Sequence, residues 1–530
     1  MEIVIVGAGA TGLKCAARAR RRDGEAKITV VDKSKEISLA RCGLPYFLSG
    51  VVHEVEDLRK TSYGVLRDEE YFKRVFDIEV LTETEALEID REKRVLKIRR
   101  RDEIDELNYD YLVISTGAEP VRIFGGDERI VTLFSAEDAG KILKFWENGA
   151  EKAVVIGAGF IGLECCEALR SLGLNVVLVE MLDQVAPFLD REIARFVEAH
   201  LKENGVEVLL SRKVKEIFAG EKLKVLCDEK IEADFVVQAI GVKPNVELAR
   251  RAGIEIGETG AIKVNEFLQT NDKRIYAGGD CVENKHLITG KGVFAPFGDI
   301  ANKHGRIIAD NITGGRSRFP GILGTSVLKV FNLTVAKTGL SEKEAISNGM
   351  KVYSVLLSAP DKSHYYPKSS NMRIKLVFGE DGRLFGAQII GQSGVDKRID
   401  VFATAIYAGL KIDEIANLDL AYSPPYSPAI DPVITSAYVA MNKRDGLLDS
   451  TRELGEIVVD LRSEEEVKGA PIANALNIPI TKIREMAKVL PKDKEITAIC
   501  PIGLRAYVAS RILKSMGFKV KAYEGGMAFL

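Results

Sequence analysis

The sequence predicts an α/β fold of several domains, in which helices alternate with the strands of parallel sheets. Its 530 residues are enough for roughly three to five domains. Hydrophobic residues make up 46% of the chain and charged residues 29%, which is the balance of a globular protein and not of a disordered one. Apolar strand-like runs that end in glycine turns and lead into helical stretches recur along the chain, and this alternation indicates βαβ units.

Two segments about 150 residues apart share one design: an apolar strand, a GxGxxG turn, a helix and a second strand that ends in an acidic residue. In the first segment the strands are 3–6 and 28–31, the turn is 7–12 and the acid is Asp32. In the second segment the strands are 153–156 and 176–179, the turn is 157–162 and the acid is Glu180. One such turn is a weak signal, but two of them in the same context indicate two dinucleotide sites.

The glycines of these turns have separate physical roles. The first allows a tight turn, the second lets backbone approach a pyrophosphate at the positive end of the helix, and the third lets the helix pack on the strand. The glycines are Gly7, Gly9 and Gly12 in the first turn and Gly157, Gly159 and Gly162 in the second. The alternative is that both are glycine turns of ordinary βαβ units and bind no dinucleotide. The repeated context favours two Rossmann-like domains, with electron transfer between two cofactors.

The later segments continue the α/β pattern. Buried strands that end in glycine turns are expected at 111–118, 235–241 and 275–280. Between about 320 and 440, strand-like stretches at 373–378 and 384–391 alternate with a helix-like stretch at 400–408. A polar joint at 442–446 then opens a separate block of about 85 residues, which has an α/β order of its own.

Composition and charge exclude several kinds of partner. With 75 Lys and Arg against 77 Asp and Glu, the net charge of −2 leaves no basic surplus for nucleic acid or anionic lipid. No apolar run reaches the ~18 residues that span a bilayer, so no membrane association is expected. The N-terminal segment lacks the features of a signal peptide, and seven scattered cysteines do not form a disulfide framework. A cytoplasmic location is therefore expected. No metal site is expected.

These features resemble the two-dinucleotide-binding flavoprotein disulfide reductases, over residues 1 to about 440. The resemblance implies that the first glycine turn and Asp32 hold the pyrophosphate and adenosine ribose of FAD. It also implies that the turn with Thr116 and Gly117 closes over FAD together with Gly279 and Asp280, with Asp280 taking a ribityl hydroxyl.

The second glycine turn then corresponds to the nicotinamide-nucleotide site. Glu180 accepts hydrogen bonds from ribose hydroxyls but repels a 2′-phosphate, and residues 181–183 offer no cation, so NADH is preferred over NADPH. The resemblance also gives the domains: an FAD-binding domain at 1–112 and 244–318, an NAD-binding domain at 113–243, and an α+β dimerisation domain at 319–441.

The redox cysteine indicates the branch of this family. Segment 38–46, SLARCGLPY, has the single cysteine Cys42 where glutathione-reductase-like members carry a pair. This resembles the branch of coenzyme A disulfide reductases, NADH oxidases and NADH-dependent persulfide reductases. The resemblance implies that Cys42 lies at a helix N-terminus and cycles between thiolate and mixed disulfide or persulfide. Buried structural roles are expected for five other cysteines, which are Cys15, Cys165, Cys166, Cys227 and Cys281.

Reduction at Cys42 needs a proton donor for the departing thiolate. The last histidine is His364, so no C-terminal histidine supplies it. The branch uses two tyrosines from the partner subunit of a homodimer, and Tyr365 and Tyr422 occupy the matching places. Tyr366 and Tyr426 are the alternative proton donors. A purely structural role is also open for all four tyrosines, in which the ring covers a hydrophobic core and the hydroxyl is hydrogen-bonded.

The resemblance also points to coenzyme A as substrate or carrier. Lys14, Arg18 and Arg21 lie at i, i+4 and i+7 of the first helix, where cations meet the phosphates of coenzyme A, and Ser38 belongs to the same substrate site. A solvated basic helix face is the alternative. Arg41 replaces the usual Asn, and Glu70 stands near a position that is often Lys. A smaller thiol therefore remains an alternative substrate.

The C-terminal block, residues 450–530, resembles a rhodanese-like α/β domain. Asp460 and Arg462 match its Asp-x-Arg entry, and segment 469–479 resembles its Gly-Ala-x-Asn-Ile-Pro stretch. The segment from Cys500 to Arg505 matches the active loop. Such a loop curls backbone N–H groups around the sulfur and ends at a helix N-terminus, which favours a thiolate and a terminal persulfide, while Arg505 fixes the loop.

Together these features predict an FAD-dependent enzyme. It uses NADH to reduce small thiol-derived substrates (coenzyme A persulfide, polysulfide or coenzyme A disulfide) through Cys42, while Cys500 handles persulfide sulfur. The alternatives are an NADH oxidase that reduces O2, and a rhodanese-linked sulfur carrier or redox sensor.

Overall fold

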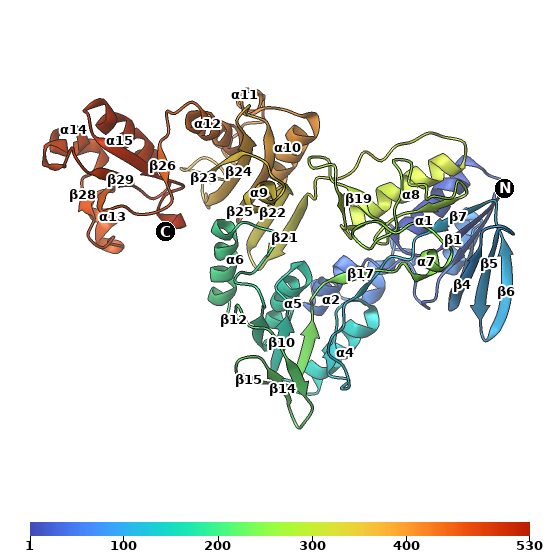
Figure 1. Cartoon of the computed structure of the whole chain (residues 1–530). Helices are drawn as coiled ribbons and strands as arrows, with labels where there is room; N and C mark the ends of the chain where they lie inside the picture. Colours follow the sequence, from blue (N-terminus) through green and yellow to red (C-terminus); the bar gives the residue numbers. More distant parts are fainter. The chain divides into compact units, whose positions relative to one another are not determined.

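The computed structural model describes residues 1–530, which form two compact units (Figure 1). The first unit contains Met1–Val185 and Leu201–Ile322, and the second contains Ala186–His200 and Leu323–Leu530. No helix is both long and apolar enough to cross a membrane.

The first unit begins with a five-stranded parallel sheet of order β18-β7-β1-β2-β3. Its strands are β1 (Glu2–Val6), β2 (Lys27–Val31), β3 (Glu79–Leu81), β7 (Tyr111–Ile114) and β18 (Ile275–Ala277). On one face, Ile3 and Ile5 pack with helices α1 (Ala10–Arg22) and α8 (Gly298–Ile312). On the other face, Val4 and Val6 pack with an antiparallel sheet of β4 (Thr84–Asp90), β5 (Val95–Arg100) and β6 (Glu103–Asn108). Because both faces are covered, the strands are continuously apolar.

The second parallel sheet repeats this design in the order β12-β11-β10-β16-β9. Its strands are β9 (Ile130–Val131), β10 (Lys152–Ile156), β11 (Asn175–Val179), β12 (Val206–Leu209) and β16 (Phe235–Gln238). A three-stranded antiparallel sheet again packs on one face, and its strands are β13 (Glu216–Phe218), β14 (Leu223–Leu226) and β15 (Lys230–Ala233). The helices of this half are α4 (Ala136–Glu147) and α5 (Phe160–Ser171).

Short elements complete the first unit. Those of the first half are η1 (Arg41–Gly43), α2 (Leu44–Leu48), η2 (Val55–Arg59), α3 (Glu69–Phe76), α7 (Glu247–Arg251), β19 (Asn284–Lys285) and β20 (Gly292–Val293). A two-stranded antiparallel ribbon of β8 (Ala118–Pro120) and β17 (Val242–Pro244) joins the segments that follow β7 and β16.

The second unit contains a five-stranded antiparallel sheet of order β21-β22-β25-β24-β23. Its strands are β21 (Ser326–Val330), β22 (Leu333–Gly339), β23 (Val352–Pro360), β24 (Asn371–Gly379) and β25 (Leu384–Gly391). The helices are α6 (Arg191–Glu203), α9 (Glu342–Ser347), α10 (Val395–Ala408), α11 (Ile412–Ile415) and α12 (Pro432–Arg444). Helix α10 packs on β22 and β25, and α12 packs on β23.

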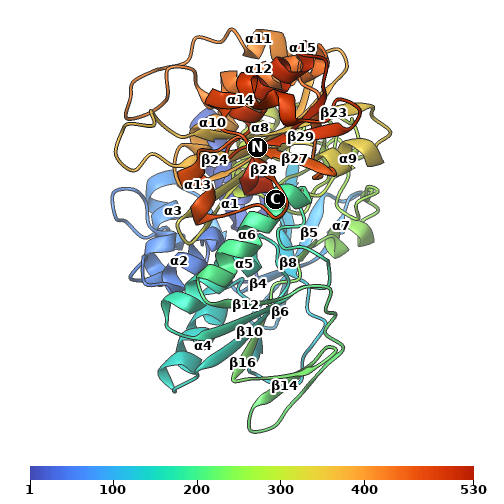
Figure 2. The ribbon, with the colours of Figure 1, turned by 90° about the vertical axis from the view of Figure 1, so that its left-hand side faces the viewer.

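A last five-stranded sheet is fully parallel, in the order β26-β30-β29-β27-β28. Figure 2 labels its strands β27, β28 and β29. Its strands are β26 (Ser450–Thr451), β27 (Ile457–Asp460), β28 (Leu476–Asn477), β29 (Glu495–Ile499) and β30 (Lys519–Tyr523). The helical elements are α13 (Glu464–Gly469), η3 (Ile480–Lys482), α14 (Ile483–Met486), η4 (Ala487–Val489), α15 (Leu504–Ser515) and η5 (Met527–Phe529).

The polar joint expected at 442–446 differs from the structure, because α12 continues through its first part and ends at Arg444. Ion pairs stabilise this helix end: Lys443 contacts Glu524, and Arg444 contacts Asp413. Only residues 445–449 therefore lie between α12 and β26.

Buried charges join the last sheet to the antiparallel sheet of the same unit. Lys375 of β24 is 1% exposed and lies 3.1 Å from Asp190, 2.9 Å from Glu192 and 2.8 Å from Glu342. Arg452, which follows β26, pairs with Glu192 at 2.7 Å, with Glu342 at 3.1 Å and with Glu524 at 2.9 Å. The last sheet is thus fixed to its neighbour by charge pairs as well as by the chain.

Candidate functional site

The first glycine-rich turn joins β1 to α1 and is shaped by close backbone approach. Gly7 has a φ of 108°, and a Cβ on it would lie 2.1 Å from the Ser115 carbonyl oxygen. A Cβ on Gly12 would lie 1.9 Å from the Gly7 carbonyl oxygen, whereas a Cβ on Gly9 would meet no atom within 4 Å. The turn is therefore closed toward the sheet and helix, and open at Gly9, where a ligand can approach the backbone.

Asp32 at the end of β2 is attached to this turn. Its Oδ2 accepts from the Ala8 backbone N–H at 2.6 Å, and its Oδ1 accepts from Ser34 at 2.8 Å. The carboxylate is therefore fixed beside the glycine turn.

The second glycine-rich turn has the same geometry. Gly157 has a φ of 100°, and a Cβ on Gly162 would lie 1.9 Å from the Gly157 carbonyl oxygen, while Gly159 is again open. Glu180 is buried, and its two carboxylate oxygens accept from the N–H groups of Ala158 at 2.7 Å and Leu182 at 2.9 Å. The two turns and their acids are thus duplicated in atomic detail as well as in sequence.

Asp280 provides an unsatisfied acceptor beside the first turn. Its Oδ1 is buried and has no hydrogen-bond partner. Burial raises the pKa of this carboxyl, and the charge of Arg41 opposes that rise. A buried acceptor without a partner is costly in a protein interior, so the site is suited to a ligand hydroxyl.

The segments around Asp280 are fixed by neighbours. His304 of α8 is fully buried, and its Nδ1 accepts from the Gly279 N–H at 3.1 Å. Thr116 donates to the Asn245 carbonyl oxygen at 2.6 Å, and Asn245 donates back to the Thr116 carbonyl oxygen at 3.0 Å. Gly117 has a φ of 66° and no atom within 4 Å of a Cβ position, so the turn at 115–117 presents open backbone.

Cys42 is the one exposed cysteine of the chain. It lies in η1, directly before Gly43 and the short helix α2. The segment is attached to the first glycine turn, because Ser38, at a φ of 61°, donates its N–H to the Ala8 carbonyl oxygen at 3.1 Å. The neighbouring Arg41 guanidinium lies over the ring of Phe134 at 4.4 Å.

The other six cysteines are buried, and they are Cys15, Cys165, Cys166, Cys227, Cys281 and Cys500. Burial raises the pKa of the Cys281 thiol to about 11, and it also raises the pKa of Cys15, Cys165 and Cys166. These four thiols are therefore poor nucleophiles at neutral pH.

The three basic residues of α1 differ in their surroundings. Lys14 is exposed, whereas Arg18 pairs with Asp310 of α8 at 2.7 Å, and Arg21 lies over the Phe76 ring at 5.8 Å. The charge of Arg18 is thus already offset by a carboxylate.

The four candidate tyrosines lie on two loops of the second unit and are exposed: Tyr365 by 67%, Tyr366 by 39%, Tyr422 by 53% and Tyr426 by 71%. The loops touch at their bases, where the Ser363 N–H donates to the Pro424 carbonyl oxygen at 3.2 Å. Tyr365 and Tyr422 are therefore brought onto neighbouring loops, although 57 positions separate them in the sequence.

The loop from Cys500 to Arg505 has the expected curled form. The Cys500 Sγ accepts from the N–H groups of Gly503 at 3.2 Å and Ala506 at 3.4 Å, at the start of α15. Arg505 forms two hydrogen bonds of 2.8 Å with Glu466 and thereby lowers the pKa of that carboxyl to about 2. The backbone N–H groups at the helix start favour a negatively charged sulfur.

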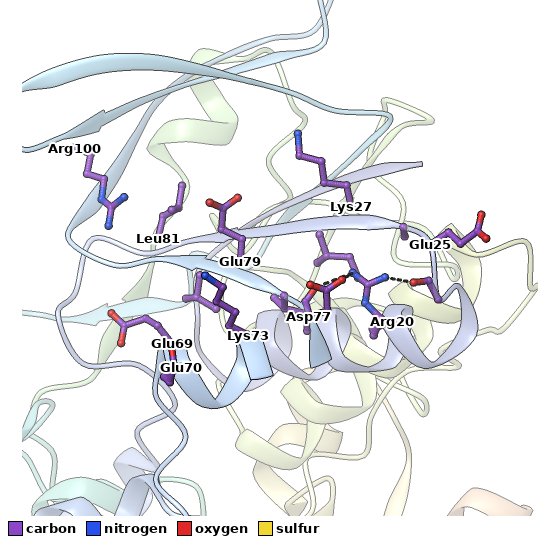
Figure 3. Close-up of a pocket in the computed structure, with 15 residues that line it drawn as sticks. Arg20, Glu25, Lys27, Glu69, Glu70, Lys73, Asp77, Glu79, Leu81 and Arg100 are labelled. Carbon is purple, nitrogen blue, oxygen red and sulfur yellow. Dashed lines mark hydrogen bonds and ion pairs between the residues drawn. The ribbon is translucent and has the colours of Figure 1, made fainter. Parts of the chain in front are cut away.

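A separate open cavity of about 580 Å³ lies beside the edge strand β3 (Figure 3). Figure 3 shows Arg20 between α1 and the Asp77 end of α3, where it donates to the Asp77 carbonyl oxygen at 2.7 Å. Glu70 lines this cavity and pairs with Arg74 of its own helix. The walls carry both signs of charge, and none of the predicted site residues lines it.

Sequence reasoning missed two buried charged groups. One is the cluster around Lys375, and the other is Arg398 with Asp431. The other charges on the Arg398 helix are exposed, and Lys375 stands in an ordinary strand pattern, so the sequence gives no signal that either cation is buried.

Three family models match the chain in succession. The model of the pyridine nucleotide-disulphide oxidoreductases matches residues 1–295, their dimerisation domain matches 325–434, and the rhodanese-like domain matches 444–528. The chain belongs to the pyridine nucleotide-disulphide oxidoreductases. Members of this family are flavoprotein oxidoreductases that use FAD and NAD(P)H. The resemblance and fold class predicted from the sequence are therefore confirmed.

Individual relatives extend the similarity over the whole chain. A solved structure of an NAD-dependent persulfide reductase from A. fulgidus is 54% identical, with a TM-score of 0.97 and full coverage of both chains. A protein of Methanocaldococcus jannaschii named NADH oxidase is 38% identical over 84% of this chain and 99% of its own. A protein of Pyrococcus furiosus named NAD(P)H sulfur oxidoreductase (CoA-dependent) is 37% identical over 83% of this chain and 98% of its own.

Proposed function

We propose that this oxidoreductase uses NADH to reduce persulfide, polysulfide or disulfide substrates at Cys42. The observation that carries the proposal is the placement of Cys42. It is the one exposed thiol among seven, and Ser38 attaches its segment to the turn that the family uses for FAD. The similarity to a persulfide reductase and to a CoA-dependent sulfur oxidoreductase supports the same class of substrate.

The first glycine turn, Asp32, Thr116, Gly117 and Asp280 hold FAD in this proposal, within a domain of residues 1–112 and 244–318. The unsatisfied Oδ1 of Asp280 and the open backbone at Gly9 support that fit. FAD, when bound, accepts a hydride from NADH and makes the electron pair available to sulfur. Asp32 orients the adenosine ribose, and Asp280 accepts a hydrogen bond from a hydroxyl of the ribityl chain of FAD.

The second glycine turn and Glu180 bind NADH, within a domain of residues 113–243. Glu180 is already held by two backbone N–H groups, so its charge is fixed in place. A 2′-phosphate next to it would face an uncompensated carboxylate, which favours NADH over NADPH.

Cys42 performs the sulfur chemistry. Its thiolate attacks the sulfane sulfur of a persulfide R–S–SH, takes that sulfur and releases R–SH. The electron pair from NADH then breaks the sulfur–sulfur bond on Cys42 and releases sulfide. The overall reaction is R–S–SH + NADH + H⁺ → R–SH + H₂S + NAD⁺. Coenzyme A is the proposed R group, held by Lys14, Arg18, Arg21 and Ser38.

The remaining domains complete the proposal. Residues 319–441 form a homodimer, in which Tyr365 and Tyr422 deliver protons at the partner subunit's Cys42. Residues 450–530 carry sulfur as a persulfide on Cys500, with Arg505 fixing the loop. The seven free cysteines support a reducing, cytoplasmic location.

Replacement of Cys42 tests the proposal. Cys42→Ser removes the nucleophile and leaves the turns intact, so sulfide release from coenzyme A persulfide should fall at least 1,000-fold, roughly the loss expected for a covalent nucleophile. Reduction of bound flavin by NADH should persist. Cys227→Ser is the control, because that thiol is buried and belongs to none of the proposed binding or catalytic sites. Sulfide release that survives in Cys42→Ser would contradict the proposal. Wild-type turnover with O2 alone would favour the oxidase reading.

A further inference from the structure

We propose that Arg398 is a positioning residue that holds the two tyrosine loops, residues 361–370 and 421–431, in a fixed position relative to each other. The inference rests on the proposed role of Tyr365 and Tyr422 as proton donors. It adds that neither loop takes its working position alone, because a single buried guanidinium holds both.

Arg398 of α10 is 1% exposed and is paired with Asp431. Its Nε lies 3.0 and 3.1 Å from the two carboxylate oxygens, and its Nη2 lies 2.9 Å from Oδ2. The charge of Arg398 helps to keep the pKa of Asp431 below its ordinary value, although burial acts against this. Such a fork-shaped pair is directional, so it sets an orientation as well as a contact.

The same guanidinium reaches both loops. Its Nη2 donates to the Asp361 carbonyl oxygen at 2.9 Å, where the first loop begins, and to the Tyr426 carbonyl oxygen at 3.5 Å, in the second loop. Asp431, which ends the second loop, also accepts from the Ser427 hydroxyl at 2.8 Å. The beginning of one loop and the end of the other are therefore held by one ion pair.

Direct contacts between the loops support this coupling. Ser363 donates its N–H to the Pro424 carbonyl oxygen at 3.2 Å and its hydroxyl to the Ser427 carbonyl oxygen at 3.4 Å. The first loop is closed on itself, because the Ser370 N–H donates to Asp361 at 2.9 Å. The bases of the loops are thus bonded and buried, while the tyrosines at their tips are exposed.

A lysine cannot replace this arrangement. Its single ammonium nitrogen cannot span the Asp431 carboxylate and two carbonyl oxygens in one plane, whereas the guanidinium carries five N–H donors in a fixed fork. Arg398→Lys therefore keeps the buried charge and loses the geometry. A tyrosine hydroxyl displaced by about 1 Å is a poor donor to the departing thiolate, and proton transfer slows by roughly 100-fold.

The test separates proton delivery from hydride transfer. In Arg398→Lys, sulfide release from coenzyme A persulfide should fall by roughly 10- to 100-fold, while stopped-flow reduction of the flavin by NADH should change less than twofold. Imidazole buffer should partly restore sulfide release by acting as an external acid, which it cannot do for a variant with a general packing defect. The matched control is Arg444→Lys, whose guanidinium pairs with Asp413 at 2.9 Å in the same compact unit; it should leave both rates unchanged.

Hydrogen exchange supplies a readout that does not depend on activity. The amides of Tyr366 and Ser370 report on the first loop, and those of Tyr426 and Ser427 on the second. In Arg398→Lys both sets should exchange faster together. Acceleration of only one loop, or of neither, would overturn the coupling. If Arg398→Lys does not fold, Ser363→Ala and Ser427→Ala remove contacts at the loop bases and should each accelerate both loops.

The outcomes also distinguish this inference from the proposed function. If Tyr365→Phe and Tyr422→Phe retain full sulfide release, the tyrosines are not donors and the proposed proton delivery fails. If the tyrosine variants lose activity while Arg398→Lys keeps wild-type rates and exchange, only the positioning role of Arg398 fails.

Discussion

Lys375→Met removes the central cation of a buried cluster. In the native protein its ammonium lies within 3.1 Å of Asp190, Glu192 and Glu342, and the side chain is 1% exposed. Burial alone would lower the pKa of this lysine, but the three carboxylates raise it above its ordinary value. Methionine has nearly the same length and no charge, so the substitution leaves Glu192 and Glu342 paired with Arg452 and removes the cation 3.1 Å from Asp190.

The expected loss at neutral pH is about 3–5 kcal/mol, because removing one partner of a buried ion pair leaves uncompensated charge. The pKa of Glu342 gives a figure for the cluster as a whole, to which Ser354 and Arg452 also contribute. Burial would raise that pKa, but Lys375 and its neighbours lower it from 4.5 to about 2. This shift corresponds to about 3 kcal/mol. For a domain of 150–250 residues, such a loss lowers the melting temperature by roughly 6–20 °C.

The pH dependence gives a second signature. In the wild type the pKa of Glu342 is depressed, so its contribution is complete above about pH 4.5 and is lost as the pH falls toward 2. Without Lys375 the pKa of Glu342 rises, and protonation then relieves the crowding of carboxylates. The gap in stability between wild type and variant should therefore narrow as the pH is lowered from 7 to 4.

Calorimetry combined with fluorescence can assign the effect to the second unit. The single tryptophan, Trp146, lies in α4 of the first unit, so a heat-absorption transition without a change in its fluorescence belongs to the second. Lys351→Met is the matched control, since Lys351 pairs with Glu380 at 3.2 Å on the surface, and such pairs contribute about 0–1 kcal/mol. Equal shifts in the two variants, or parallel pH profiles of wild type and Lys375→Met, would refute the reasoning.

Three further outcomes test the nucleotide and sulfur sites. Asp280→Asn removes a buried charge with an unsatisfied oxygen, so the melting temperature of the apoprotein should rise. The Kd for FAD should also rise, roughly tenfold, because the acceptor for the FAD hydroxyl is weakened. Calorimetry and flavin-fluorescence titration would show whether stability increases while FAD affinity decreases. Glu180→Gln keeps an acceptor for the backbone and removes the charge, so the KM for NADPH should fall roughly tenfold in steady-state assays while that for NADH stays within threefold. Cys500→Ser should abolish persulfide labelling of the C-terminal domain in mass spectra and slow sulfide release from polysulfide, yet spare coenzyme A persulfide; equal rates on both substrates would mean that Cys500 carries no sulfur.

Local pattern was enough to predict the duplicated architecture. The strands expected at 3–6 and 153–156 are β1 and β10, each extended by one residue, and both glycine turns have the close approaches that their spacing implies. The same holds for the loop at Cys500, because a strand, a cysteine and a Gly-x-Arg are all local signals.

Long-range charge pairing could not be predicted in the same way. Lys375 stands in the segment Arg373–Phe378 like any polar residue of an alternating strand, and its partner Asp190 lies 185 positions earlier. Arg398 stands between Lys397 and Asp400 on a helix that shows several charges. Which of these charges is buried depends on segments brought together only by the fold, so no spacing rule identifies them.

The contacts of Arg452 bear on how this C-terminal domain can be exchanged between proteins. Arg452 and Glu524 are inherited with the domain, but their partners Glu192, Glu342 and Lys443 lie elsewhere in the chain. A chimaera that joins residues 445–530 to another reductase would keep the pair between Arg452 and Glu524 but lose the contacts of both with Glu192, Glu342 and Lys443. The grafted domain would be connected to its host by the linker alone and would have no fixed orientation. The orientation of Cys500 would then have to be designed together with the host surface.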